Sequence, residues 1–145
     1  MRAVVQRVTE ARVRVDDQVV GEIGAGLCVL VGVTHEDDEA NAAALADKLW
    51  HLRVFDDDQG SMNRSVADTS RQILVVSQFT LYGDTRKGRR PSWQAAARPE
   101  QAAPLIEHLC RLLTERGAYL AKGVFGAEMD VELVNEGPVT LVLEV

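Results

Sequence analysis

Histidine and cysteine are scarce in this 145-residue chain, which has three histidines and two cysteines. The cysteines, Cys28 and Cys110, stand far apart and lack the paired spacing of a zinc site. The histidines His35, His51 and His108 are dispersed over a loop and two expected helices, and none lies beside a polar motif. We therefore expect no metal site, no cofactor and no catalytic histidine, and we interpret both cysteines as small core residues.

Several sequence signals that would mark other classes of protein are also absent. No segment approaches the roughly 20 apolar residues that span a bilayer, and the N-terminus has no signal-peptide run, so we expect a soluble, cytoplasmic protein. No G-x-S-x-G nucleophile motif occurs. The acidic run 56–60 lacks the later glutamate of an EF-hand, and it therefore indicates a turn and not a calcium loop.

Positive charge is in deficit, because the formal net charge is −6. Broad binding to a nucleic acid backbone requires many lysines and arginines, so we expect no DNA binding and only local contact with RNA. One segment qualifies for that contact. Four cations fall within five residues, and these candidate phosphate-binding residues are Arg86, Lys87, Arg89 and Arg90.

The residues that are present suit one α/β domain over 1–145, since 46% of the chain is hydrophobic and the length is typical of a single core. Alternating or continuous apolar patterns predict strands at 2–8, 11–15, 18–23, 26–33, 73–76, 118–124, 129–134 and 139–145. Helical spacing predicts helices at 38–52 and from about 99 to a stop at Gly117, with Pro104 expected to delay the regular start of the second. The strands should form a mixed sheet, whose order the periodicity leaves open.

Two short polar motifs stand beside apolar strands. The first is the run 77–81, with sequence SQFTL, and the second is the run 135–140, with sequence NEGPVT. Both motifs resemble the signatures of the D-aminoacyl-tRNA deacylase family, and the resemblance extends nearly from end to end. It implies a single-domain, three-layer α/β/β arrangement with mixed sheets and two main helices. It also implies a homodimer with active sites at the subunit interface.

The resemblance implies that the first motif is catalytic, with Ser77, Gln78, Phe79 and Thr80 holding the aminoacyl group. The N–H groups of Phe79 and Thr80 would face the scissile carbonyl. Hydroxyls and amides are poor bases, so such a site suits the activated ester of an aminoacyl-tRNA 3′ end, whose ribose hydroxyl can help to activate water. We expect Thr80 to orient the substrate, because a threonine without a nearby base is a weak nucleophile.

The second motif is implied to be a chiral filter. A cis Gly137-Pro138 bond would point backbone carbonyls into the partner subunit's pocket, where they would exclude L side chains and admit glycine. From sequence alone, an X-Pro bond is more often trans. Further family positions, which brace this filter or contact the terminal adenosine, are Asn135, Thr140, Arg7, Phe125 and Met129. Ordinary core packing is the alternative for Phe125 and Met129.

Three functions are compatible with these motifs. The first is hydrolysis of D-aminoacyl-tRNAs and mischarged glycyl-tRNA. The second is an editing relative that removes L-amino acids through a trans Gly-Pro motif, and the third is a non-catalytic module that binds the tRNA 3′ end. The intact motif 77–80 in a free-standing chain favours the first, and a hydrolysis assay separates it from the third.

Overall fold

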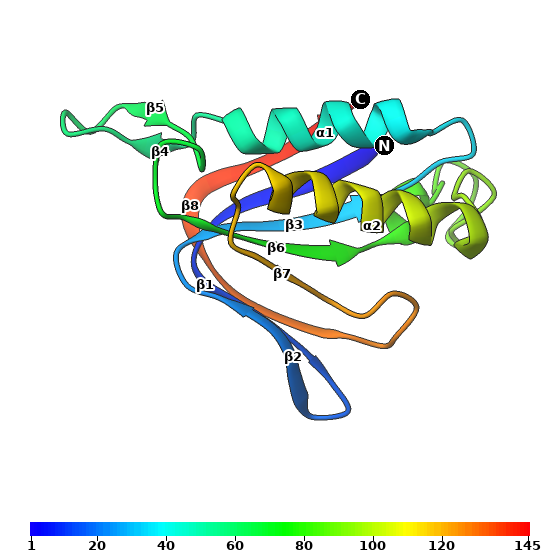
Figure 1. Cartoon of the computed structure of the whole chain (residues 1–145). Coiled ribbons are helices and arrows are strands. Elements are labelled where there is room, and N and C mark those ends of the chain that lie inside the picture. Colours follow the sequence, from blue (N-terminus) through cyan, green and yellow to red (C-terminus); the bar gives the residue numbers. More distant parts are fainter.

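The computed structural model describes all residues from 1 to 145 as one mixed sheet carrying two helices. Its elements follow the chain in the order β1 (Arg2–Val15), β2 (Gln18–Ile23), β3 (Gly26–Gly32), α1 (Glu39–His51), β4 (Phe55–Asp56), β5 (Met62–Arg64), β6 (Gln72–Ser77), the 3-10 turn η1 (Phe79–Tyr82), α2 (Pro99–Glu115), β7 (Leu120–Lys122) and β8 (Asp130–Glu144). Figure 1 shows α1 and α2 side by side on the same face of the sheet.

The six strands of the large sheet run in the order β2-β1-β3-β6-β7, and β8 pairs along β1. Strands β3, β6 and β7 are parallel, and helices α1 and α2 make the crossovers between them. Strand β1 is antiparallel to β2, β3 and β8. The parallel strands β3 and β6 read as continuous apolar runs because they are covered on both faces.

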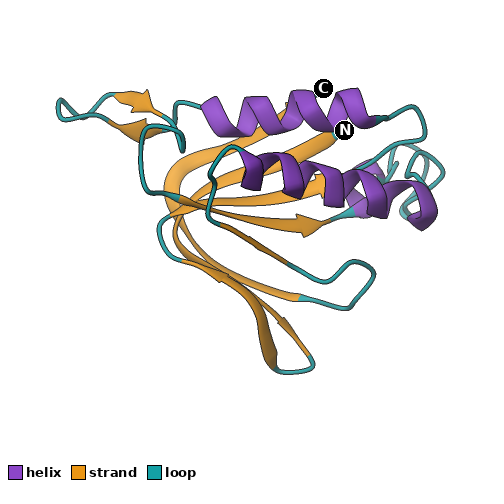
Figure 2. Ribbon diagram, viewed as in Figure 1, coloured by secondary structure: helices purple, strands orange, loops and turns teal.

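Two hydrophobic cores divide the molecule into three layers. The larger one has 24 buried residues and lies between the helices and the upper face of the sheet. The smaller one has seven and lies on the opposite face, under β3 and β6. Its floor is formed by β2 and the distal halves of β1 and β8, which bend away beneath the sheet (Figures 1 and 2). Gly21 permits this crossing, because a Cβ there would lie 2.5 Å from the carbonyl oxygen of Lys122.

In two places, a pair of strands predicted from the sequence forms one long strand in the structure. We expected separate strands at 2–8 and 11–15, but β1 is continuous, and the expected strands at 129–134 and 139–145 are both parts of β8. The pairing of β1 with β8 shifts register between Gln6 and Val8 and again between Val8 and Glu10. Extra residues at such bulges break the period-two pattern without ending the strand, so the sequence falsely suggested interruptions.

The helices were predicted more accurately. Helix α1 starts after Asp38, whose carboxylate accepts hydrogen bonds from the N–H groups of Ala40 and Asn41, and the Asn41 side chain completes the capping box. The expected delay at Pro104 was wrong. Helix α2 begins at Pro99 with Pro104 inside it, on an exposed face where the missing N–H leaves the carbonyl of Glu100 open to solvent.

Some short elements were not predicted. The acidic turn at 56–60 lies in a small hairpin formed by β4 and β5, and η1 begins inside the first motif, at Phe79. Strand β7 covers only three of the seven residues expected at 118–124. None of the helices combines the length and the apolar character that a membrane crossing requires.

Candidate functional site

A pocket of about 550 Å³ opens at the carboxyl end of β6, beside the start of α2. Thirteen of its eighteen lining residues are hydrophobic. Ser77, Gln78 and Phe79 of the first motif form part of the wall, and Phe125 and Met129 line it too. The pocket therefore brings together five of the residues that the family resemblance assigned to the site, although the two groups lie some fifty positions apart in the sequence.

The end of β6 is fixed by hydrogen bonds to its neighbour β3. The N–H of Gln78 donates to the carbonyl of Val31 at 2.7 Å, and η1 begins at the next residue. The first N–H groups of a helical turn have no acceptor within it, so those of Phe79 and Thr80 are free to donate outward. Such a pair of donors could stabilise negative charge on a carbonyl oxygen.

Thr80 does not line the pocket. Its hydroxyl instead accepts a close hydrogen bond from the side-chain amide of Gln78. Gln78 therefore holds Thr80 at the edge of the site, and no histidine or carboxylate contacts the hydroxyl. This geometry supplies no base that could activate the Thr80 hydroxyl as a nucleophile.

Arg2 secures the far end of η1, a contact that the sequence did not suggest. Its guanidinium donates to the carbonyl of Leu81 at 2.7 Å, lies 4.8 Å from the centre of the Tyr82 ring, and pairs with Glu144 at 2.6 Å. Arg2 and Leu81 are 79 residues apart in sequence, so no local pattern could reveal the contact. Arg2 ties the turn that carries Phe79 to strands β1 and β8.

Arg98 is the single ionisable residue among the pocket-lining residues. It is exposed at the N-cap of α2, and its guanidinium forms no ion pair. The positive end of the helix dipole points the same way. The pocket thus has a positive rim and no acid or base in its wall, a combination that suits an anionic ligand carrying an apolar group.

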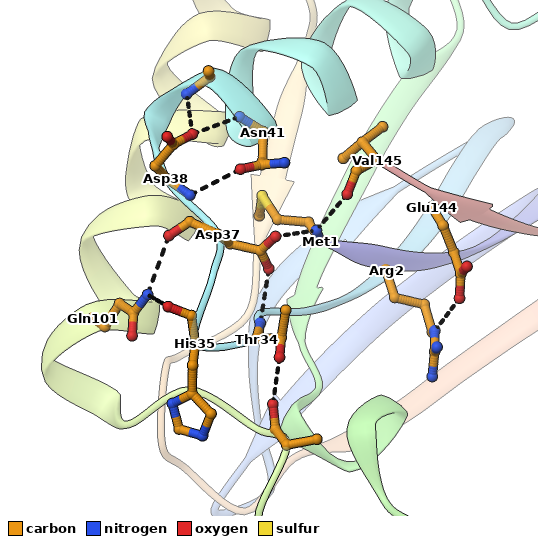
Figure 3. Close-up of polar contacts among 12 residues, drawn as sticks. Met1, Arg2, Thr34, His35, Asp37, Asp38, Asn41, Gln101, Glu144 and Val145 are labelled. Atoms are coloured by element: carbon orange, nitrogen blue, oxygen red, sulfur yellow. Dashed lines mark hydrogen bonds and ion pairs between the residues drawn. The ribbon is translucent and has the colours of Figure 1, made fainter.

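The outer wall of the pocket is formed by residues 93–97, which are hydrogen-bonded to the loop after β3. Ala97 donates to the carbonyl of Val33 at 2.9 Å, and the hydroxyl of Thr34 donates to the carbonyl of Ala95 at 2.6 Å. Figure 3 shows Asp37 at the centre of this loop, where its carboxylate accepts from the N–H of Thr34 and from the α-amino group of Met1. The wall is therefore held from the protein interior.

Two aromatic residues stand at the rim. The rings of Phe79 and Trp93 meet edge to face with centroids 5.3 Å apart, and their exposed fractions are 57% and 43%. The indole also lies against Gly83, where an added Cβ would come within 2.5 Å of a ring carbon. Trp93 lies outside both motifs, and no sequence pattern marks it.

The basic loop is closed at its base beside Trp93. Asp84 and Ser92 exchange two backbone hydrogen bonds, of 2.8 and 2.9 Å, so the segment between them projects from the rim. The guanidinium of Arg86 donates two hydrogen bonds, of 2.9 and 2.7 Å, to the carboxylate of Asp84. These bonds lower the pKa of Asp84 to about 2. The other three cations of the loop, Lys87, Arg89 and Arg90, are exposed and carry no ion pair.

The second motif lies on β8 away from the pocket of its own chain. Gly137 and Pro138 are exposed, and the peptide bond between them is cis, as the resemblance implied. Opposite Arg7, the ladder between β1 and β8 is interrupted, because pairing passes from Thr140 directly to Asn135. The amide of Asn135 spans the interruption, donating to the carbonyls of Arg7 and Val139.

Arg7 and Thr140 support this segment from β1 and β8. Arg7 is 7% exposed and donates to the carbonyl of Val54 at 2.7 Å, while its Nε lies 3.6 Å from a carboxylate oxygen of Glu136. Thr140 accepts from the side chain of Gln6 at 3.2 Å. None of these residues lines the pocket, so the two predicted halves of the site do not meet within one chain.

The remaining candidates behave as ordinary structural residues. Cys28 and Cys110 are buried in the two cores, and burial raises the pKa of each thiol to about 11. The side chains of His35, His51 and His108 do not line the pocket. No three histidine, cysteine, aspartate or glutamate side chains come together in a geometry that could bind a metal ion.

Comparison with known proteins gives a consistent answer. Residues 4–144 match the family described as D-Tyr-tRNA(Tyr) deacylase. The D-aminoacyl-tRNA deacylase of Thermus aquaticus is 58% identical over 99% of this chain and 95% of its own length, and that of Nocardia farcinica is 59% identical over 99% of both chains.

Solved structures show the same fold. The c-Myc DNA unwinding element binding protein superposes with a TM-score of 0.94 at 40% identity, covering 100% of this chain and 99% of the other. A probable eukaryotic D-amino acid tRNA deacylase superposes with a TM-score of 0.87 at 18% identity, over 99% and 98% of the two chains, and it supports the fold alone.

Proposed function

The chain belongs to the D-Tyr-tRNA(Tyr) deacylase family, and from this premise we propose that it is a hydrolase that cleaves the ester of D-aminoacyl-tRNAs. The observation that carries the proposal is the pocket at the end of β6, which joins free N–H donors and an apolar wall to a positive rim. An aminoacylated 3′ adenosine offers the matching groups, namely a carbonyl, an apolar side chain and base, and a phosphate.

The catalytic step follows from what the pocket wall lacks. Water must attack the ester carbonyl, and the wall offers no carboxylate or imidazole to take its proton. We propose that the neighbouring 2′ hydroxyl of the substrate's ribose accepts the water's proton while its own proton passes to the departing 3′ oxygen. The N–H groups of Phe79 and Thr80 stabilise the oxyanion, an effect worth several kcal/mol for preorganised donors. The ribose oxygen then leaves as the tRNA 3′ hydroxyl, with the amino acid released as the free acid.

Selection by chirality requires a second subunit. The exposed segment Gly137–Pro138 is anchored by Asn135 but lies outside its own pocket. We propose that it enters the pocket of the partner in a homodimer, where backbone carbonyls bind the amino group and exclude an L side chain. Exclusion of this kind admits glycine, so mischarged glycyl-tRNA is a further substrate.

The outer surface of β8 supports the dimer. This strand pairs with β1 along one edge only, and Val134, Leu141 and Val142 on it are 51%, 37% and 64% exposed. Exposed aliphatic residues on an edge strand are typical of an association surface. Light scattering at assay concentrations tests the proposal, and a monomer that retains chiral selection would contradict it.

Deacylation of matched D-tyrosyl-, L-tyrosyl- and glycyl-tRNA without added metal tests the function. Hydrolysis of the D-tyrosyl and glycyl esters, with the L ester spared, is the expected result. Cleavage of the L ester would identify an editing relative of opposite selectivity. Tight binding of all three without turnover would identify a module that only binds the tRNA end.

A further inference from the structure

We propose that Trp93 is a stacking platform for the nucleotide that precedes the terminal adenosine of the tRNA, an inference that rests on the proposed function. It would make Trp93 a specificity-determining residue, one that distinguishes a polynucleotide ester from the ester of a single nucleoside. Neither motif contains it, and its indole takes part in no step of the hydrolysis.

The indole of Trp93 is exposed at the mouth of the pocket. Trp93 lies on the rim of the pocket, with 43% of its surface exposed, although a tryptophan of this size is ordinarily well buried. A cavity of about 550 Å³ is of the size that encloses one small ligand. An aminoacyl-adenosine is a ligand of this class, and with that group bound the next nucleotide would lie outside the pocket, at the rim.

The indole is also held in place. It lies against the backbone at Gly83, and Phe79 meets it edge to face at 5.3 Å. Its neighbour Ser92 closes the two-bond bridge to Asp84. A platform fixed on these sides loses little freedom when a base stacks on it, so the stacking energy is retained in binding.

The charges around Trp93 match a nucleotide. Arg98, without an ion pair, lines the same pocket, and the exposed cations Lys87, Arg89 and Arg90 project from the loop that ends at Ser92. Aromatic side chains between cations are how proteins bind single-stranded nucleic acid, with stacked bases and paired phosphates. A single-stranded tRNA 3′ end has this chemistry, whereas a free amino acid ester has no phosphate.

The test compares D-tyrosyl esters of adenosine and of the trinucleotide CCA. We expect the wild-type protein to prefer the trinucleotide ester in kcat/KM by about ten-fold, within the range of one stacked base. Trp93→Leu should abolish most of that preference, and Trp93→Phe should retain most of it. Tyr119→Leu, at an exposed aromatic residue remote from the pocket, is the matched control. An unchanged preference in Trp93→Leu would overturn the proposal.

A binding measurement makes the test independent of turnover and of the leucine variant's folding. Trp50 is the second tryptophan of the chain and packs against the larger core, so Trp50→Phe leaves Trp93 as the single indole fluorophore. Its emission should be quenched by uncharged CCA trinucleotide and far less by adenosine. Equal quenching by both, or none, would overturn the proposal. If the platform fails while D-tyrosyl-tRNA is still hydrolysed, the proposed function stands without it.

Discussion

The side-chain amide of Asn135 donates a hydrogen bond of 3.0 Å to the carbonyl of Arg7 and a second, of 3.1 Å, to the carbonyl of Val139. These bonds bridge the point where the ladder between β1 and β8 is interrupted. Arg7 and Val139 are buried, while Gly137 and Pro138, which lie between Asn135 and Val139 in the chain, are exposed. One amide thus holds the base of the segment that we propose enters the partner's pocket.

Replacing Asn135 by alanine should loosen that segment. Two carbonyls lose a donor, and the free energy of unfolding should fall by about 1–2 kcal/mol. Chiral selection should fall with it, seen as a rise in hydrolysis of L-tyrosyl-tRNA relative to the D ester. Arg14→Gln is the control, because it removes an exposed hydrogen bond to Glu132 from the same strand pair, away from this segment. Equal selectivity in both variants would show that the anchor has no role in the filter.

Arg2 should matter to turnover, because its bond to Leu81 holds η1. Arg2→Gln should lower kcat by roughly ten- to a hundred-fold, since small displacements of catalytic donors are costly, with little change in tRNA affinity. Arg14→Gln is a matched control, because Arg14 also lies on β1 and pairs with a glutamate of β8, Glu132, in the layer away from the pocket. Similar activities of the two variants would contradict a positioning role for Arg2.

The hydroxyl of Thr80 should be dispensable. It contacts Gln78 and does not line the pocket, so Thr80→Ala should retain kcat within about ten-fold, whereas loss of an essential nucleophile costs many orders of magnitude. Single-turnover deacylation measures this directly. Abolished turnover with intact folding and tRNA binding would refute assistance by the substrate's ribose hydroxyl.

Much of the molecule could be predicted from local patterns. Helix α1 could be placed because Asp38 is a strong N-cap followed by apolar residues at helical spacing, and the position of Ser77 at a strand end followed from the buried run before it. That β8 is one continuous strand could not be predicted. Residues 135–138 interrupt the alternation of apolar and polar residues, and such an interruption usually marks a turn between two strands. The positions of Arg2 and Trp93 at the site could not be predicted either, because they depend on contacts with Leu81 and Phe79 that form only in the folded chain.

The buried thiols predict a loss of stability at high pH. Cys28 and Cys110 ordinarily ionise near pH 9.0, and burial raises the pKa of each to about 11. The unfolded chain releases these protons first, so the contribution of the thiols to the free energy of unfolding is constant below about pH 9 and falls toward pH 11, by on the order of 2–3 kcal/mol per thiol. Urea titrations of the wild type and of Cys28→Ala should show a shallower fall for the variant. Native thiols should also resist iodoacetamide at pH 8 and react once unfolded.

The basic loop should supply affinity for tRNA in proportion to its free cations. Replacing Lys87, Arg89 and Arg90 by glutamine should weaken tRNA binding and reduce the slope of log K against log salt by about 2–3, close to one counterion for each lost phosphate contact. The control changes the same charge elsewhere, at the exposed residues Lys48, Arg53 and Arg111. Arg86→Gln should have a smaller effect than any single change in the loop, because its guanidinium is engaged by Asp84. If the loop and control variants have the same salt dependence, the loop does not bind the phosphate backbone, and the cation that serves the site is Arg98.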